Sequence, residues 1–99
     1  MNFPKNILLE CVDKTINHMI KEHEIEKLTK TGKQIKEYSK IVKNKFAEFP
    51  ADVGVNTLYR FLTKTFENMS DRNNMVISSY IKIYCKTFVN NLQEAMGDA

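Results

Sequence analysis

The chain has 99 residues, of which 42% are hydrophobic and 27% charged, and its formal net charge is +3. This length and composition predict one soluble helical or mixed globular domain over residues 1–99, large enough to bury a core of its own. They exclude a membrane span, because the uncharged stretch from Met75 to Ile81 is far shorter than the ~20 residues that a spanning helix needs.

A first helix is predicted from about Lys5 to Leu28, because apolar residues recur there at helical spacing. The main members of this apolar face are Leu8, Val12, Ile16 and Met19. The outward positions are acidic, at Glu10, Asp13, Glu22, Glu24 and Glu26. The apolar spacing drifts near the end of the segment, which allows a bend near His23.

A second helix is predicted from about Gly32 to Glu48. Thr31 and Gln34 have the spacing of a capping box, in which the hydroxyl and the amide each satisfy an exposed backbone N–H. The apolar face contains Ile35, Tyr38, Val42, Phe46 and Phe49. The opposite face carries four lysines at the same period, Lys33, Lys36, Lys40 and Lys43.

The main loop is expected from Phe49 to Asn56, with Pro50 as a helix breaker and Asn56 as the N-cap of the next helix. A third helix is predicted from about Thr57 to Met69, burying Leu58, Phe61 or Leu62, Phe66 and Met69. A polar turn over residues 70–74 follows, in which Ser70 or Asp71 is expected to cap the fourth helix.

The fourth helix, Met75 to Leu92, is the most apolar segment of the chain. Its apolar line contains Ile77, Ile81, Tyr84, Phe88 and Leu92. The alternative is a pair of strands, since valine, isoleucine and aromatic residues favour sheets, but the helical series holds over four turns. Gly97 is expected to end the helix in a left-handed conformation.

Together these segments predict an all-α fold, a small four-helix bundle with short loops, in which the fourth helix supplies most of the core. Four helices with one apolar face each cannot bury all of the large apolar side chains. Tyr59, and either Tyr80 or Ile83, should remain partly exposed. Surplus apolar surface of this kind favours a partner interface or a homodimer.

A basic stripe is the sharpest polar feature. Seven lysines and one glutamate lie between Lys27 and Lys45, which gives this segment a net charge of +6. Three interpretations remain open: a solvated face balanced by the acidic first helix, a nucleic-acid contact, or a contact with an acidic protein surface. Lysine lacks the planar fork of arginine, which disfavours specific base readout.

The segment from Val53 to Lys64 carries a short resemblance. Its residues 57–61, with the sequence TLYRF, resemble the start of the recognition helix in TetR-type regulators. The segment departs from that pattern at Asp52, where the motif has a glycine, and at Pro50. The resemblance implies a nucleic-acid-binding regulator in which Tyr59, Arg60 and Lys64 face the groove.

A second resemblance concerns architecture. A lysine-rich segment, Lys43 to Phe46, then a proline loop and two helices, is similar to the layout of bacteriocin immunity proteins. This layout implies a small inhibitor or immunity factor.

Catalytic and metal-binding patterns are nearly absent. His18 and His23 are five residues apart, a spacing that does not place both on one helix face as a zinc pair requires. Cys11 and His18 would lie about 10 Å apart along a helix, too far for thiol activation. We therefore predict no enzyme, no cofactor, no metal and no catalytic residue.

The predicted function is non-enzymatic binding of a macromolecular partner in the cytoplasm, as an inhibitor, immunity or accessory factor. The preferred partner is a protein with an acidic surface, and nucleic acid is the alternative. The candidate contact residues are Lys33, Lys36, Lys40, Lys43, Tyr59 and Arg60. No signal peptide is expected, so Cys11 and Cys85 should remain reduced thiols.

Overall fold

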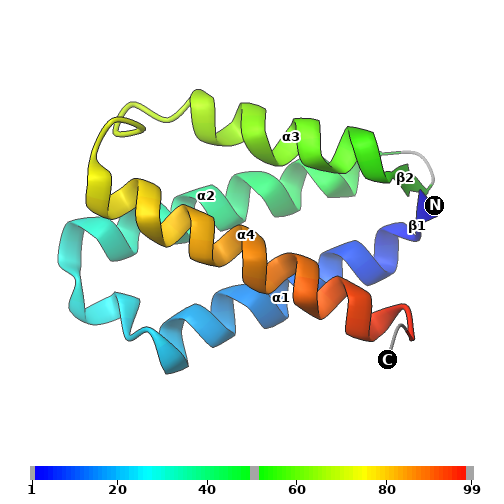
Figure 1. The fold of residues 1–99 in the computed structure, drawn as a ribbon, viewed down its shortest axis with the longest axis horizontal. Helices are drawn as coiled ribbons and strands as arrows, with labels where there is room; N and C mark the ends of the chain where they lie inside the picture. Colours follow the sequence, from blue (N-terminus) through cyan, green and yellow to red (C-terminus); the bar gives the residue numbers. More distant parts are fainter. Residues whose placement is uncertain (1, 50–51, 98–99) are drawn as a thin grey trace.

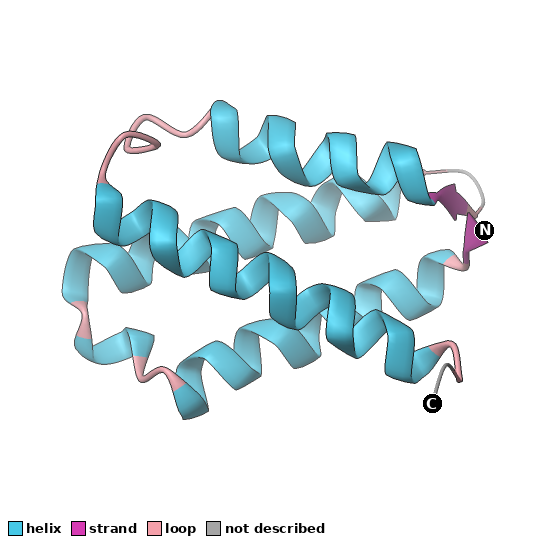
Figure 2. Ribbon diagram, in the orientation of Figure 1, coloured by secondary structure: helices cyan, strands magenta, loops and turns pink. Residues whose placement is uncertain are grey.

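The computed structural model describes residues 2–49 and 52–97. It contains four helices, with a one-turn 3-10 helix, η1, and two very short strands (Figure 1, Figure 2). The helices are α1 (Lys5–Glu22), α2 (Thr29–Glu48), α3 (Val55–Glu67) and α4 (Met75–Ala95); η1 is Ile25–Lys27, β1 is Asn2–Phe3 and β2 is Val53–Gly54. Successive helices run in opposite directions (Figure 1). The prediction of an all-α helical bundle is therefore confirmed.

Helix α4 lies across the other helices and packs most extensively against α1 (Figure 1). Its buried side chains are the five predicted from the sequence, Ile77, Ile81, Tyr84, Phe88 and Leu92. The segment is one continuous helix, so the alternative of a strand pair is wrong. Tyr80 and Ile83 are half-buried against the core, whereas Tyr59 remains 48% exposed.

Aromatic rings join α2, α3 and α4 in the centre of the bundle. The rings of Phe46 and Phe88 are nearly parallel, with centroids 5.9 Å apart, and Phe61 approaches Phe46 to 5.3 Å. The rings of Tyr38 and Tyr84 meet edge to face at 5.3 Å. Such pairs add about 0.5–1.5 kcal/mol beyond the area that they bury.

The hydroxyl groups that are buried with these rings all have partners. Tyr38 donates a hydrogen bond of 3.0 Å to the backbone carbonyl of Leu62, which fastens α3 to α2. Ser39 and Tyr84 share a hydrogen bond of 2.8 Å between α2 and α4. In the described part of the chain no buried side-chain nitrogen or oxygen lacks a partner. A buried polar network that is fully satisfied helps to specify one packing arrangement.

The junction between α1 and α2 differs from the prediction. α1 ends at Glu22 rather than Leu28, and Glu24 adopts a left-handed backbone conformation with φ 48°. Ile25 then turns inward and is fully buried. The drift in apolar spacing near His23 therefore marks the end of the helix rather than a bend within it.

The capping box at Thr31 and Gln34 is also wrong. α2 begins at Thr29, with Leu28 as its N-cap and no side-chain cap, so Thr31 lies inside the first turn. Gly32 is buried in this turn against the carbonyl group of Ile25. Tertiary contact between α2 and η1 fixes the helix start here, in place of local side-chain capping.

The start of α3 and the N-cap of α4 were also predicted wrongly, although α4 begins at Met75 as predicted. α3 begins at Val55 with Gly54 as N-cap, so Asn56 is not the cap. α4 is capped by Asn74, whose Oδ1 accepts hydrogen bonds from the N–H groups of Val76 and Ile77, so neither Ser70 nor Asp71 caps it. Gly97 has the predicted left-handed conformation, with φ 78°. Pro50, the predicted helix breaker, lies outside the described residues.

The small sheet was not predicted from the sequence. β1 and β2 pair antiparallel, with Asn2 opposite Gly54 and Phe3 opposite Val53. Phe3 and Val53 are both buried, so the strand pair adds two apolar side chains to the core at one end of the bundle. It also places the start of the chain beside the start of α3 (Figure 1).

Candidate functional site

An apolar depression lies between α3 and α4. Its volume is about 270 Å³. The lining side chains are Tyr59, Leu62, Thr63 and Phe66 from α3 and Ser78, Ile81, Lys82, Cys85 and Val89 from α4. Lys82 is the one charged residue among them.

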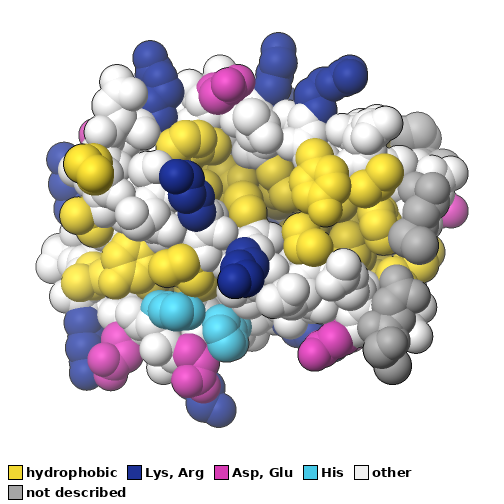
Figure 3. Space-filling model, viewed as in Figure 1, with side chains coloured by type: hydrophobic (Ala, Val, Ile, Leu, Met, Phe, Trp, Pro, Cys, Tyr) yellow, Lys and Arg dark blue, Asp and Glu magenta, His cyan; other side chains and the backbone are white. Residues whose placement is uncertain are grey.

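A second depression, of about 200 Å³, continues along the same two helices. It shares Tyr59 and Val89 with the first. Its other lining residues are Phe3, Val55, Leu58, Leu92 and Gln93. We call the two depressions together the α3–α4 groove. Figure 3 shows apolar surface gathered over these two helices on this face of the molecule.

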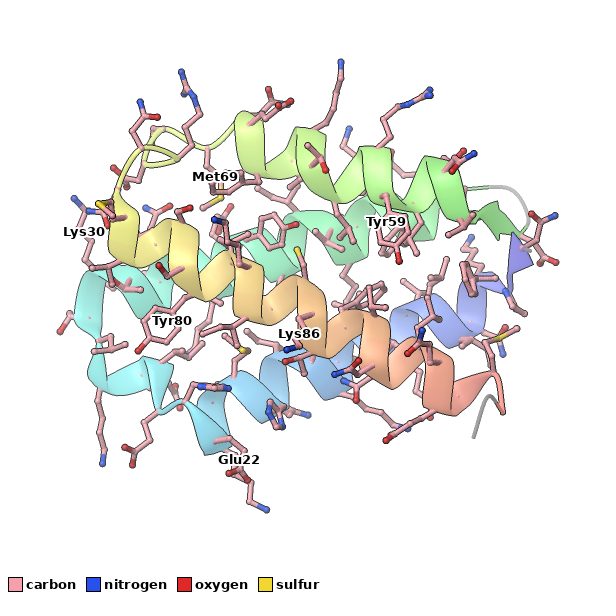
Figure 4. All side chains as sticks on the ribbon, viewed as in Figure 1. Glu22, Lys30, Tyr59, Met69, Tyr80 and Lys86 are labelled. Carbon is pink, nitrogen blue, oxygen red and sulfur yellow. The ribbon has the colours of Figure 1, made fainter. Side chains whose placement is uncertain are left out.

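The groove exists because α3 is fastened to α2 rather than to α4. Leu58, Leu62 and Thr65 are the buried residues of α3, and the Leu62 carbonyl accepts the hydrogen bond from Tyr38 of α2. This leaves Tyr59 at the side of α3 that faces α4, where it is half-exposed (Figure 4). The side of α3 next to α4 is therefore apolar but incompletely covered.

The charge around the α3–α4 groove is positive. Lys82 lines it, and Lys86 is exposed one turn further along α4 (Figure 4). Neither lysine takes part in an ion pair with any described residue. No carboxylate from the described residues lines either depression. An acidic group brought into the groove would therefore meet the unpaired cation of Lys82, with Lys86 on the same helix outside the lining.

The Cys85 thiol, which lines the α3–α4 groove, and the buried phenols of Tyr38 and Tyr84 have raised pKa values. Burial is the main cause for Cys85 and for Tyr38, whose Sγ and Oη atoms lie 3.5 Å apart. Because the Tyr38 proton is donated to Leu62, the Cys85 thiol donates to the Tyr38 oxygen. Burial also raises the pKa of Tyr84, and its hydrogen bond with Ser39 opposes part of that rise.

These shifts predict that the protein loses stability in alkali. The unfolded chain ionises its tyrosines near their ordinary pKa of 10.0, while the folded protein keeps Tyr38 and Tyr84 neutral. Stability from these groups is therefore complete below about pH 9 and falls above pH 10, by about 1.4 kcal/mol per pH unit for each tyrosine. Urea titrations from pH 8 to 11 will measure this slope.

The control is Tyr84→Phe. It should reduce the slope of the unfolding free energy against pH by the contribution of one tyrosine, even if it also changes the stability at pH 8. An unchanged slope would contradict the assignment to Tyr84.

The predicted lysine stripe lies on another face. Tyr38, Val42 and Phe46 point from α2 into the core, where Tyr38 and Phe46 contact α4, so the lysines opposite them face away from α4. Lys36 pairs with Glu26 near the end of α1, and Lys43 pairs with Asp13 of α1 at 2.9 Å. Lys33 and Lys40 form no ion pair within the described ranges. Half of the stripe is therefore neutralised within the molecule.

Tyr59 and Arg60 are adjacent in sequence but serve different surfaces. Tyr59 lines the α3–α4 groove, whereas Arg60 lines an indentation between α2 and α3 together with Lys45 and Lys64. The six predicted contact residues therefore divide among three places and do not form one surface.

The helix-turn-helix arrangement is not seen in the segment that resembled it. α2 and α3 lie alongside each other in opposite directions (Figure 1), whereas the helices of that motif cross at about 90–120°. Tyr59 and Lys64 line different depressions, so they do not face one groove together.

The two histidines lie closer than their spacing suggested. Their ring centroids are 5.5 Å apart, because α1 ends at Glu22 and the chain turns at His23. Figure 3 shows the two rings side by side on the surface. No cluster of three or more histidine, cysteine, aspartate or glutamate side chains suited to a metal ion occurs within the described residues.

Sequence reasoning missed most of the groove. Leu62 and Ile81 were assigned to the core, and they are indeed nearly buried while also forming the groove floor. The excess apolar character of Tyr59 was the one signal that pointed to this face.

Both cysteines are free thiols.

None of the helices in the described part of the chain is both long and apolar enough to cross a membrane. No family model matches the chain, and no curated protein or solved structure matches it at a significant level.

Proposed function

We propose that this protein is a non-enzymatic binding protein that engages an acidic surface of another protein through the α3–α4 groove. The observation that carries the proposal is an uncovered apolar groove whose only lining charge, among the described residues, is Lys82. An inhibitor, immunity or accessory factor would act in this way, by occupying a surface of its target.

The chemistry of the groove suits a protein partner. Protein interfaces combine an apolar centre with a polar rim, and tyrosine is enriched among the residues that contribute most to affinity. Tyr59 is such a residue, half-exposed between the two depressions. Lys82 and Lys86 would favour an acidic partner, mainly by orienting the encounter and raising its rate.

The lysine stripe supports this proposal less strongly. Its lysines at positions 36 and 43 already have carboxylate partners, and the exposed ion pairs that they form contribute little stability. Lys33 and Lys40 of α2 form no ion pair within the described ranges, and neither lines the α3–α4 groove. They serve best as the matched control for the groove.

Site-specific photocrosslinking tests the proposed function. The photoreactive residue p-benzoylphenylalanine replaces Tyr59 in one variant and Lys33 in the other, and each purified protein is irradiated in extract from the source cells. We expect a discrete adduct from position 59 that protease destroys and nuclease does not. We also expect Val89→Asp, introduced into the same protein, to abolish the adduct, because it places a charge in the groove.

Four results would contradict the proposal. An adduct removed by nuclease would favour the nucleic-acid alternative. An adduct with twice the mass of the chain would favour a homodimer through this face. Equal adducts from positions 59 and 33, or an adduct that survives Val89→Asp in a folded protein, would show that the groove is not the docking surface.

A further inference from the structure

We infer that the occupant of the α3–α4 groove is a short amphipathic α-helix, with two apolar anchors seven residues apart and acidic side chains along one flank. The inference rests on the proposed function and specifies the partner's chemistry.

The walls of the groove favour a helix over an extended peptide. Both walls are α-helices, whose backbone N–H and C=O groups are bonded within the helix. An extended segment placed between them would leave its own backbone groups without partners, at a cost for each group. A helix satisfies its backbone internally and presents only side chains, as in known helix-in-groove complexes.

The two depressions set the spacing of the anchors. Along α4 the first depression centres between Ile81 and Cys85 and the second between Val89 and Leu92. Seven to eight residues separate them, or about 11 Å at 1.5 Å per residue. Residues i and i+7 of a guest helix lie on one face about 10.5 Å apart, so one anchor can enter each depression. Tyr59 would then contact the residues between the anchors.

The positive charge near the groove lies on the α4 side. Lys82 and Lys86 lie four residues apart on α4, which puts their Cβ atoms about 5–6 Å from each other. The α3 wall offers the uncharged side chains of Tyr59 and Thr63. A guest helix should therefore carry an acidic residue next to Lys82, and a second one three or four positions away on the same flank would approach Lys86 outside the lining.

A second copy of the chain is a poorer occupant. A two-fold dimer through the groove presents the same patch from both subunits, which would bring the two pairs of Lys82 and Lys86 toward each other. Like charges that face across an interface oppose association.

A panel of synthetic helical peptides tests the inference, with binding to the purified full chain measured by fluorescence anisotropy. The reference peptide has leucines at positions i, i+4 and i+7 and glutamates on one flank. A second peptide replaces the glutamates with lysines, and a third moves the last leucine from i+7 to i+9. We expect the reference peptide to bind at least ten-fold more tightly than either variant.

Variants of the protein then locate the contact. Val89→Asp should weaken binding of the reference peptide at least ten-fold, and Lys33→Glu with Lys40→Glu should change it less than two-fold. Lys82→Glu with Lys86→Glu should reverse the preference, so that the lysine peptide binds more tightly than the glutamate peptide. Circular dichroism will verify that each variant remains folded. This reversal distinguishes a direct charge contact from general damage to the groove.

Failure of the inference is distinguishable from failure of the proposed function. If the Tyr59 adduct forms but the peptides do not bind at several hundred micromolar, a protein docks in the groove and its docking segment is not this helix. If the peptides bind without regard to charge or spacing, the inferred anchors and acidic flank are wrong. Loss of binding in the lysine-stripe control would also overturn the inference, because it would place the contact on α2.

Discussion

Phe88→Asp should unfold the protein. The Phe88 side chain is fully buried in α4 and stacks on Phe46 of α2, so its removal alone would cost about 3–5 kcal/mol. The carboxylate adds several kcal/mol, because no described cation lies in this part of the core to pair with it. Domains of this size have about 5–15 kcal/mol of stability, and this change should exhaust it. Circular dichroism and thermal melting will measure the loss.

The matched control is Asn90→Asp, which puts the same carboxylate on an exposed position of the same helix. It should change the melting temperature by only a few degrees, as surface substitutions typically do. A folded Phe88→Asp protein would mean that α4 is not the centre of the core.

Ile81→Asp should also unfold the chain. It is the less stringent test, because Ile81 lies at the floor of the α3–α4 groove.

Gly32→Ala should destabilise the protein, against the usual direction of this substitution. In a helix, alanine is normally more stable than glycine by about 0.5–1 kcal/mol. Here the added Cβ atom would overlap the backbone oxygen of Ile25 and stand 3.0 Å from its carbonyl carbon. The contact is with backbone, so no side chain can rotate to relieve it. We expect a net loss of about 2 kcal/mol or more, measured by urea unfolding.

Gly54→Ala provides the comparison. The nearest atom to its added Cβ is Asn2 Oδ1 at 3.3 Å, the end of a flexible side chain. Its effect should therefore be well under that of Gly32→Ala. Equal effects at the two positions, or a stabilised Gly32→Ala protein, would show that α2 does not pack closely on η1.

The core of the fold could be predicted from the sequence because it depends on periodicity. The apolar line of α4 and the split between apolar and lysine faces of α2 follow directly from residue spacing, and the structure buries the residues that spacing selected. The starts of α2 and α3 could not be predicted in the same way. Their N-caps, Leu28 and Gly54, make no side-chain cap hydrogen bond, and these starts lie instead against Ile25 of η1 and Asn2 of β1.

The α3–α4 groove was hidden for a related reason. Whether a residue such as Leu62 or Val89 faces the core or a groove depends on how closely two helices approach. Here α3 is held against α2, in part by the Tyr38–Leu62 hydrogen bond, which joins residues 24 positions apart. Residue spacing within one helix carries no information about it. The proximity of His18 and His23 was missed because the end of α1 was misplaced.

The packing of α4 on α1 has a consequence for synthesis on the ribosome. The most extensive contact in the bundle joins α1 to α4, so it can form only after α4 (Met75–Ala95) has been translated. Until then the buried faces of α1 and α2, with residues such as Leu8, Val12 and Val42, lack their cover. The bundle should therefore complete its core only once α4 has left the ribosome, and until then the emerging segment is exposed to aggregation and to chaperones.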